Sequence, residues 1–191
     1  MSTHLHDNWL TPMRALFSCL AILLTGFLSG CNGDDPTPVN EEEVITTVQV
    51  TLVSQDGGPP VLLRFFDRDG ELGANPPEIT VSGSLEASST YSAVIDLQNE
   101  TEDPPIAIAE EVEEESEHHL FCFDVGGNIV IEYADHDLNG LPIGLLTTWE
   151  IGGAGPAEVT VTLRHQPGTK TGECPGGGDT DAQVTFPLVI Q

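Results

Sequence analysis

Short stretches in which hydrophobic and polar residues alternate recur along the chain from residue 44 onward. In VITTVQVTLV (44–53), Val48, Val50 and Leu52 fall on one face, and TYSAVIDL (90–97) alternates in the same way. A period of two indicates strands that bury one face. Nine such strands are predicted, at 44–53, 61–66, 78–83, 90–97, 119–125, 128–134, 145–151, 158–165 and 183–190. Short strands separated by Gly, Pro and Asp turns predict an all-β fold, a β-sandwich.

Two of the turns predict hairpins. DGGPP (56–60) separates the first two strands, and Gly126-Gly127 separates 119–125 from 128–134. Glycine-containing turns between alternating runs are typical of antiparallel neighbours, so each pair is expected to be adjacent in one sheet.

One acidic segment breaks the strand pattern. Residues 104–118 (PPIAIAEEVEEESEH) predict one short helix, with Asp103 as its N-cap, prolines in its first turn, and Ile108 and Val112 on one face. The alternative is a disordered acidic loop, because blocks of like charge often remain unfolded.

Near the start of the strand at 90–97, a tyrosine follows a leucine at a characteristic spacing. LEASSTY (85–91) resembles the tyrosine corner of fibronectin type III domains, although Ala87 stands where that family usually has proline. The resemblance implies that the Tyr91 hydroxyl bonds back to the loop backbone and that the sandwich is immunoglobulin-like.

The N-terminal region contains a short hydrophobic run that ends in a cysteine. ALFSCLAILLTGF (15–27) follows Arg14 and is too short to span a bilayer as a helix, but it fits the hydrophobic region of a secretory signal. Met13, directly before Arg14, makes a better start than Met1. Leu28-Ser29-Gly30-Cys31 resembles the lipobox of bacterial lipoprotein signal peptides. That resemblance implies cleavage before Cys31 and lipidation of its thiol and amine; the alternative is an ordinary signal peptide or an uncleaved helix.

The predicted organisation is a signal peptide at 1–30, an acidic tether at 31–43 and one domain at 44–191. The tether, CNGDDPTPVNEEE, is rich in Gly, Pro, Asn and acids, which cannot build a core. Asp34-Asp35 resembles the acidic export signal of surface lipoproteins in some Gram-negative bacteria. The position directly after the cysteine, where an inner-membrane retention signal usually has Asp, is Asn32.

The mature chain also resembles a group of bacterial lipoproteins. The resemblance rests on NEEEVITTV, LQNETEDP, EEVEEESEHHLF and the ending VTLRHQP…VTFPLVIQ. Some members carry a type 1 periplasmic binding fold label. The present chain lacks the alternation of strands and helices that such a two-lobed fold requires.

Acidic residues dominate the charge. The chain has 31 Asp and Glu against 5 Lys and Arg, a formal net charge of −26. Such a surface repels phosphate backbones, which argues against a nucleic-acid partner, and it attracts divalent cations or basic partners. The alternative is that the charge serves solubility alone.

Two acidic turns predict possible calcium sites. ADHDLNGLPIG (134–144) has the alternate spacing of the first half of a calcium loop, but Leu146 stands where the loop would need a bidentate Glu. The expected ligands there are Asp135, Asp137, Asn139 and the carbonyl of Leu141. FDRDGELG (66–73) offers a weaker second set, Asp67, Asp69 and Glu71. The alternative for both is Asx-turn chemistry that serves the backbone.

The number of cysteines and the spacing of the histidines indicate their roles. Once Cys19 leaves with the signal and Cys31 takes lipid, Cys122 and Cys174 remain, and an oxidising compartment favours a disulfide between them over two free thiols. The histidines of the mature chain, His118, His119, His136 and His165, show no metal-ligand spacing, so solvated or structural roles are expected.

No catalytic motif is recognised in the chain. The sequence therefore favours a non-catalytic binding or structural module, lipid-anchored to the outer membrane through Cys31 and displayed at the surface. Calcium is its possible cofactor, and its expected partner is an envelope protein, a surface protein or a glycan. The alternatives are a periplasmic ligand-capture protein that serves a transporter and an enzyme of unknown type.

Overall fold

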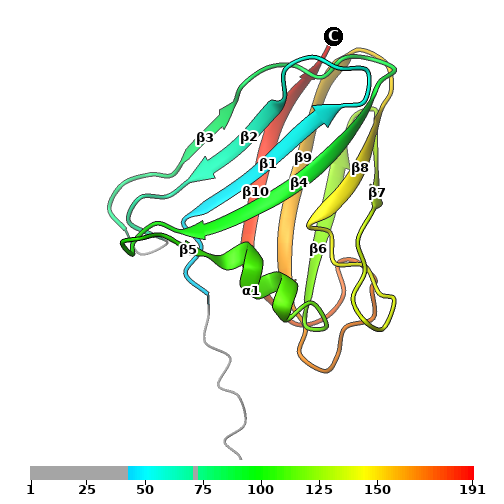
Figure 1. The fold of residues 1–191 in the computed structure, drawn as a ribbon. Helices are drawn as coiled ribbons and strands as arrows, with labels where there is room; N and C mark the ends of the chain where they lie inside the picture. Colours follow the sequence, from blue (N-terminus) through cyan, green and yellow to red (C-terminus); the bar gives the residue numbers. More distant parts are fainter. Residues whose placement is uncertain (1–42, 71–72) are drawn as a thin grey trace, which may run out of the picture. The chain divides into compact units, whose positions relative to one another are not determined.

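A computed structural model describes residues 43–70 and 73–191, so the predicted signal peptide, Cys31 and nearly all of the tether lie outside the described residues. The described part contains ten strands and one helix (Figure 1). The strands are β1 (Thr47–Ser54), β2 (Val61–Phe66), β3 (Glu78–Val81), β4 (Thr90–Asn99), β5 (Ile106–Ala107), β6 (His119–Gly126), β7 (Ile129–Tyr133), β8 (Leu146–Ile151), β9 (Gly155–His165) and β10 (Asp179–Ile190), and the helix is α1 (Ile108–Glu114). This helix is short, and no helix within the described ranges is long and apolar enough to cross a membrane.

The strands form two antiparallel sheets that pack face to face (Figure 1). The larger sheet has the order β3-β2-β1-β4-β8-β7, with β5 added to the end of β4, and the smaller sheet has the order β10-β9-β6. The predicted all-β sandwich is therefore confirmed, with β5 as one strand more than the nine expected.

Alternation in the sequence becomes alternation of burial. Val48, Val50 and Leu52 of β1 are at most 2% exposed. Trp149 of β8 and Phe186 of β10 are fully buried and belong to the same core. Each fully buried large apolar side chain contributes about 1.5–3 kcal/mol of transfer free energy, so the face shared by the two sheets is the main source of stability.

The first predicted hairpin is confirmed and the second is wrong. β1 pairs with β2 in antiparallel register, with Val50 opposite Leu63. β6 and β7, however, lie in different sheets, because β6 pairs with β9 and β7 pairs with β8. Gly127, at φ +100°, turns the chain from one sheet to the other, and a Cβ there would lie 2.8 Å from the Cβ of Ala157. A glycine turn looks the same in sequence whether it closes a hairpin or crosses between sheets.

The helix is shorter than the sequence predicted. It spans Ile108–Glu114 and not 104–118, and it is preceded by Ala107 without a side-chain cap, so Asp103 is not its N-cap. Backbone pairing of β5 with β4, in which Ala107 lies opposite Gln98, keeps the preceding residues extended. The helix still buries Ile108 and Val112, as its spacing predicted.

The predicted tyrosine contact is present. Tyr91 is 2% exposed, and its hydroxyl accepts a hydrogen bond of 3.0 Å from the backbone N–H of Glu86. The bond joins the start of β4 to the loop before it, which is the local role expected of the tyrosine.

The two ends of the sandwich differ (Figure 1). At the α1 end lie Glu43, helix α1 and the loops 134–145 and 166–178. At the opposite end, here called the turn end, lie the connections 55–60, 82–89, 126–128 and 152–154. The described chain enters the domain at the α1 end.

Candidate functional site

Asp135, the first predicted calcium ligand, binds the backbone of its own loop. One carboxylate oxygen accepts the N–H of Gly144 at 2.7 Å, and the other accepts the N–H of Leu146 at 2.9 Å. These bonds fix the return of the chain into β8. Both oxygens therefore already have donors in the described structure.

Asp137 is a buried carboxylate paired with the lysine of the loop 166–178. Its Oδ1 accepts the N–H groups of Asn139 and Leu141, each at 2.9 Å, and its Oδ2 accepts Lys170 Nζ at 2.9 Å. The side chains of Asp137 and Lys170 are 0% and 2% exposed. Burial opposes the charge, but the bonds from Lys170 and from the backbone outweigh it and hold the pKa of Asp137 below its usual range.

The remaining predicted ligands of this loop are also engaged. The carbonyl of Leu141 accepts the N–H of Asp137 at 2.8 Å, and the Asn139 side-chain amide donates to Glu117 at 3.0 Å. The geometry is that of the Asx-turn alternative. Calcium binding by this loop stays a prediction, and it requires an ion to displace Lys170 from Asp137.

The second predicted set, in the turn after β2, is only partly described. Asp69 accepts bonds from the N–H of Ala74 and from the backbone and side-chain nitrogens of Asn75. The Ala74 bond leads the contributions that lower the pKa of Asp69. Asp67 is 8% exposed, and its Oδ1 is buried without a hydrogen-bond partner in the described structure. Glu71 lies outside the described residues.

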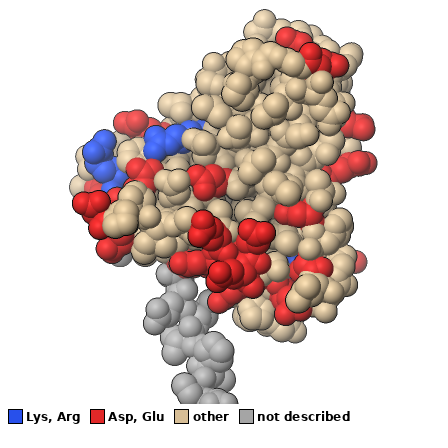
Figure 2. Space-filling view, in the orientation of Figure 1, with Lys and Arg blue, Asp and Glu red and all other residues tan. Residues whose placement is uncertain are grey.

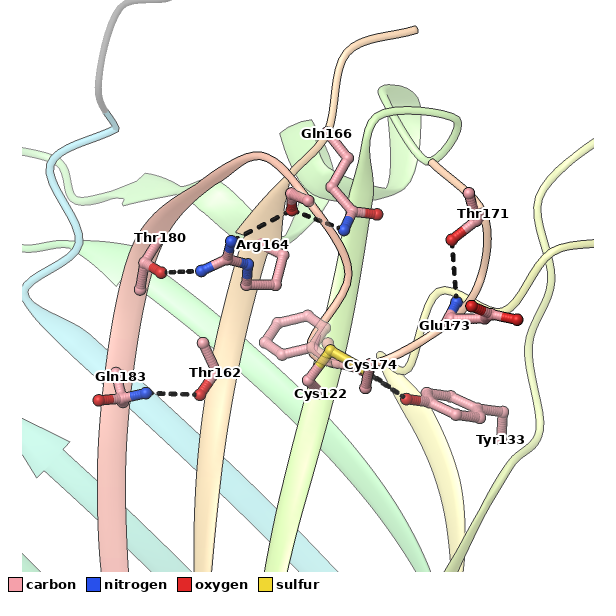
Figure 3. The surroundings of a disulfide bond; sticks show 12 residues. Cys122, Tyr133, Thr162, Arg164, Gln166, Thr171, Glu173, Cys174, Thr180 and Gln183 are labelled. Atoms are coloured by element: carbon pink, nitrogen blue, oxygen red, sulfur yellow. Dashed lines mark hydrogen bonds between the residues drawn. A yellow bond between two sulfur atoms is a disulfide. The ribbon is translucent and has the colours of Figure 1, made fainter. Parts of the chain in front are cut away.

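A disulfide joins Cys122 of β6 to Cys174 of the loop 166–178 (Figure 3), as the count of cysteines predicted. The Tyr133 hydroxyl lies beside this bond, 3.5 Å from Cys174 Sγ, and donates to the carbonyl of Phe121 at 2.7 Å. The bond fastens the Gly-rich loop to the smaller sheet. It thereby supports the position from which Lys170 reaches Asp137.

A groove of about 420 Å³ runs beside the disulfide on the smaller sheet (Figure 3). Its one cationic lining residue, Arg164, donates to the hydroxyl of Thr180 and to the carbonyls of Gly177 and Gly178. Gln166 also donates to Gly177, at 2.8 Å. The guanidinium is thus used to bind the loop to β10.

Acidic side chains gather over α1 and the segment after it (Figure 2). They are Glu110, Glu111, Glu113, Glu114, Glu115 and Glu117. The α1 end of the domain therefore has a strongly negative surface that attracts cations.

Two strand-end histidines meet beneath this surface. His119 begins β6, His165 ends β9, and antiparallel pairing places them opposite one another. Their rings stack with centroids 4.7 Å apart and planes within 10°. His119 Nε2 lies 3.7 Å from Glu43 Oε1 and 3.9 Å from Asp181 Oδ2. We call these four residues, His119, His165, Asp181 and Glu43, the histidine–carboxylate cluster.

Burial sets the protonation of the cluster. The His119 side chain is 2% exposed; burial, and then the charge of His165, lowers its pKa to about 4. Burial, followed by the charges of Asp181, Glu111 and Glu115, raises the pKa of Glu43 to about 7. Near neutral pH the His119 imidazole is therefore neutral, and its second ring nitrogen, Nδ1, lies 3.2 Å from the carbonyl of Glu115.

The described residues contain two groups of three His, Cys, Asp or Glu side chains whose ligand atoms all lie within 4.8 Å of one another. One is His119, His165 and Asp181, and the other is Glu115, His118 and His165. Neither contains Asp135 or Asp137. His136, the other histidine of the mature chain, belongs to neither group.

Sequence reasoning missed the cluster and the Lys170–Asp137 pair. A histidine at each of two strand ends was visible, but not that β6 pairs with β9. Lys170 offered a clearer signal, since it is the single lysine of the chain. A lone cation among so many acids is a good candidate for a specific ion pair.

Compared with known proteins, the chain matches no family model, no curated protein and no solved structure.

Proposed function

We propose that this chain is a lipid-anchored lipoprotein of a bacterial outer membrane whose sandwich is a non-catalytic binding module. The lipobox that ends in Cys31 supports the anchor, and Asp34-Asp35 supports display at the surface. Three predicted calcium ligands, Asp69, Asp135 and Asp137, accept hydrogen bonds from the backbone of their loops. These bonds support a structural role for the three residues.

The observation that carries the binding role is the side from which the chain enters the domain. Glu43 lies at the α1 end, beside His119. At most about 40 Å of extended chain separates it from Cys31. The turn end lies at the opposite end of the domain from this point of entry, and loops at one end of a rigid sandwich are common binding surfaces.

The turn end offers a groove along the edge of the larger sheet. Its volume is about 490 Å³, and its lining residues include Val130 of β7 and Glu150 of β8. β7 is an edge strand, and Val130 is 56% exposed. An edge strand with an exposed apolar side chain can pair with an extended segment of another protein, so the proposed partner is a surface or envelope protein.

The anchor is tested by Cys31→Ser. Wild-type protein should remain in the membrane pellet until detergent is added, whereas the variant should become soluble, because two or three acyl chains are lost. Cys19→Ser, which alters a cysteine inside the hydrophobic run, is the matched control and should behave as wild type. Retention of the Cys31 variant in the pellet would refute the anchor.

The binding surface is tested by placing a photo-crosslinking amino acid at Val130 in intact cells. We expect a discrete cross-linked partner from that position and none from Ile79, a 46% exposed residue of β3 at the opposite edge of the same sheet. Equal cross-linking from both positions would contradict a partner at the β7 edge. Protease added to intact cells should digest the domain if it is displayed outside.

A further inference from the structure

We infer that the histidine–carboxylate cluster is a binding site for a divalent transition-metal ion such as zinc, with His119, His165 and Asp181 as ligands and Glu43 beside them. Imidazole nitrogen and carboxylate oxygen are the ligand atoms that zinc and its neighbours accept. The residues come from three paired strand ends and from the segment before β1, so the sandwich itself brings them together.

The hydrogen bonding of His119 orients one lone pair into the cluster. A carbonyl can only accept, so the contact of Nδ1 with the Glu115 carbonyl assigns the ring proton to Nδ1. Nε2 of the neutral ring is then an acceptor that faces the carboxylates of Glu43 and Asp181. Metal-binding histidines commonly donate their other N–H to a backbone carbonyl in this way.

The Nε2 lone pair of His119 and the carboxyl groups of Glu43 and Asp181 thus converge, and His119 forms no hydrogen bond to either carboxyl group. The distances from Nε2, 3.7 and 3.9 Å, are too long for hydrogen bonds. Glu43 Oε2 is buried and lacks a hydrogen-bond partner in the described part of the chain. A cation among these atoms would accept the Nε2 lone pair of His119 together with carboxyl oxygens.

The separations suit a metal ion. With metal–ligand bonds of about 2.0–2.1 Å, neighbouring ligands of a tetrahedral ion lie about 3.3 Å apart and opposite ligands of an octahedral ion about 4.2 Å apart. The two distances from Nε2 fall between these values, and the ligand atoms of His119, His165 and Asp181 all lie within 4.8 Å of one another. Closing the site around an ion requires the side chains to rotate toward it.

The two imidazole rings stack in nearly parallel planes, with centroids 4.7 Å apart. Because the lone pair of a ring nitrogen lies in the ring plane, joint coordination of one ion requires one ring to turn out of this stack. The acidic surface over α1 attracts cations to this end of the domain. The charge of the cluster and its surroundings therefore complements a dication.

The site is tested by titrating the full chain, purified in detergent and freed of metal with a chelator, with zinc. We expect one zinc ion per chain by equilibrium dialysis. We also expect the melting temperature to rise by about 5–10 °C at a free zinc concentration about 100 times the dissociation constant. Calcium and magnesium should give much smaller shifts, since both prefer all-oxygen sites. Cobalt bound in place of zinc should give a visible absorption band that responds to the same variants.

Variants assign the ligands. His165→Gln and Asp181→Asn should each weaken zinc binding at least about tenfold, whereas His136→Gln, which changes an exposed histidine outside the cluster, should not. His118→Gln should also leave the affinity unchanged, because His118 belongs only to the neighbouring group with Glu115. Loss of binding in the His118 variant with retention in the Asp181 variant would overturn the assignment. Equal shifts with zinc and magnesium, or zinc binding untouched by both ligand variants, would overturn the site itself.

Discussion

Lys170 is the single lysine of a chain with 31 Asp and Glu residues, yet its side chain is only 2% exposed. Besides Asp137, its ammonium binds the carbonyl of Ser116 at 2.8 Å. One side chain thus joins the loop 166–178 to the loop 134–145 and to the segment after α1. Removing one partner of a buried ion pair leaves an uncompensated charge, which costs more than the pair itself contributes.

We expect Lys170→Met to lower the free energy of unfolding by about 3–5 kcal/mol at pH 7. Arg64→Met is the matched control, because Arg64 forms an exposed pair with Glu100 and its loss should cost at most about 1 kcal/mol. Urea unfolding followed by fluorescence measures both. A cost for Lys170→Met no larger than that of the control would show that the buried pair is not important for stability.

Lys170→Met also tests the prediction that the loop 134–145 binds calcium. If calcium uses Asp137, it competes with the Lys170 ammonium, so calcium should raise the melting temperature of Lys170→Met more than that of wild type. An equal effect of calcium and magnesium on both proteins would indicate charge screening without a site.

Asp137 also predicts a dependence of stability on acid. Its folded pKa lies below the value of 3.8 expected for the unfolded chain. Between the two values the unfolded state binds more protons, so the contribution of Asp137 is complete above pH 3.8 and is lost as the pH falls through the folded pKa. In urea unfolding between pH 5 and pH 2, the stability of Asp137→Asn should fall less steeply than that of wild type, by at most about 1.4 kcal/mol per pH unit.

Asp56→Asn, in an exposed turn, is the control for that experiment and should follow the wild-type slope. Identical slopes for wild type and Asp137→Asn would mean that Asp137 titrates alike in the folded and unfolded states.

At the scale of elements, the loop 166–178 depends on its disulfide. We expect Cys122→Ser with Cys174→Ser to lower the free energy of unfolding by about 2–4 kcal/mol, since the bond joins residues 52 apart in sequence. Limited proteolysis of this double variant should cut first within 166–178, while Cys19→Ser should resemble wild type. Intact-mass analysis after alkylation should count no free thiol at Cys122 or Cys174 in the native protein. Two free thiols there would contradict the bond.

At the scale of elements, the sequence predicted where the strands lie better than it predicted which strands pair with one another. The alternation at 90–97 identified β4 and its buried residues, because one buried face leaves a local pattern. The partner of β6 left no local pattern, since β9 begins well after β6 ends and both pair through backbone groups common to every residue. The predicted start of the helix was wrong for a similar reason, because the pairing of β5 with β4 determines where α1 begins.

At the scale of the whole molecule, the candidate site follows from the topology. His119, His165 and Asp181 come from three strands whose order could not be read from the chain, so their approach could not be predicted. Asp135 and Asp137, which lie close in sequence, were easier to select, but the described structure uses them for the backbone and for Lys170. Residues close in sequence could be grouped from the sequence alone, whereas the grouping of His119, His165 and Asp181 became visible only in the folded structure.

The crossing of the chain from β6 to β7 also has a kinetic consequence. Because β6 and β7 enter different sheets, β6 pairs with β9, and the paired residues lie from 32 (Gly126 and Glu158) to 46 (His119 and His165) positions apart in sequence. Domains dominated by such distant contacts fold in about milliseconds to seconds, more slowly than helical bundles. During that interval hydrophobic strands are exposed, and the net charge of −26 makes unfinished chains repel one another. The acidity that defines the surface of the finished domain would then also protect it from aggregation while it folds.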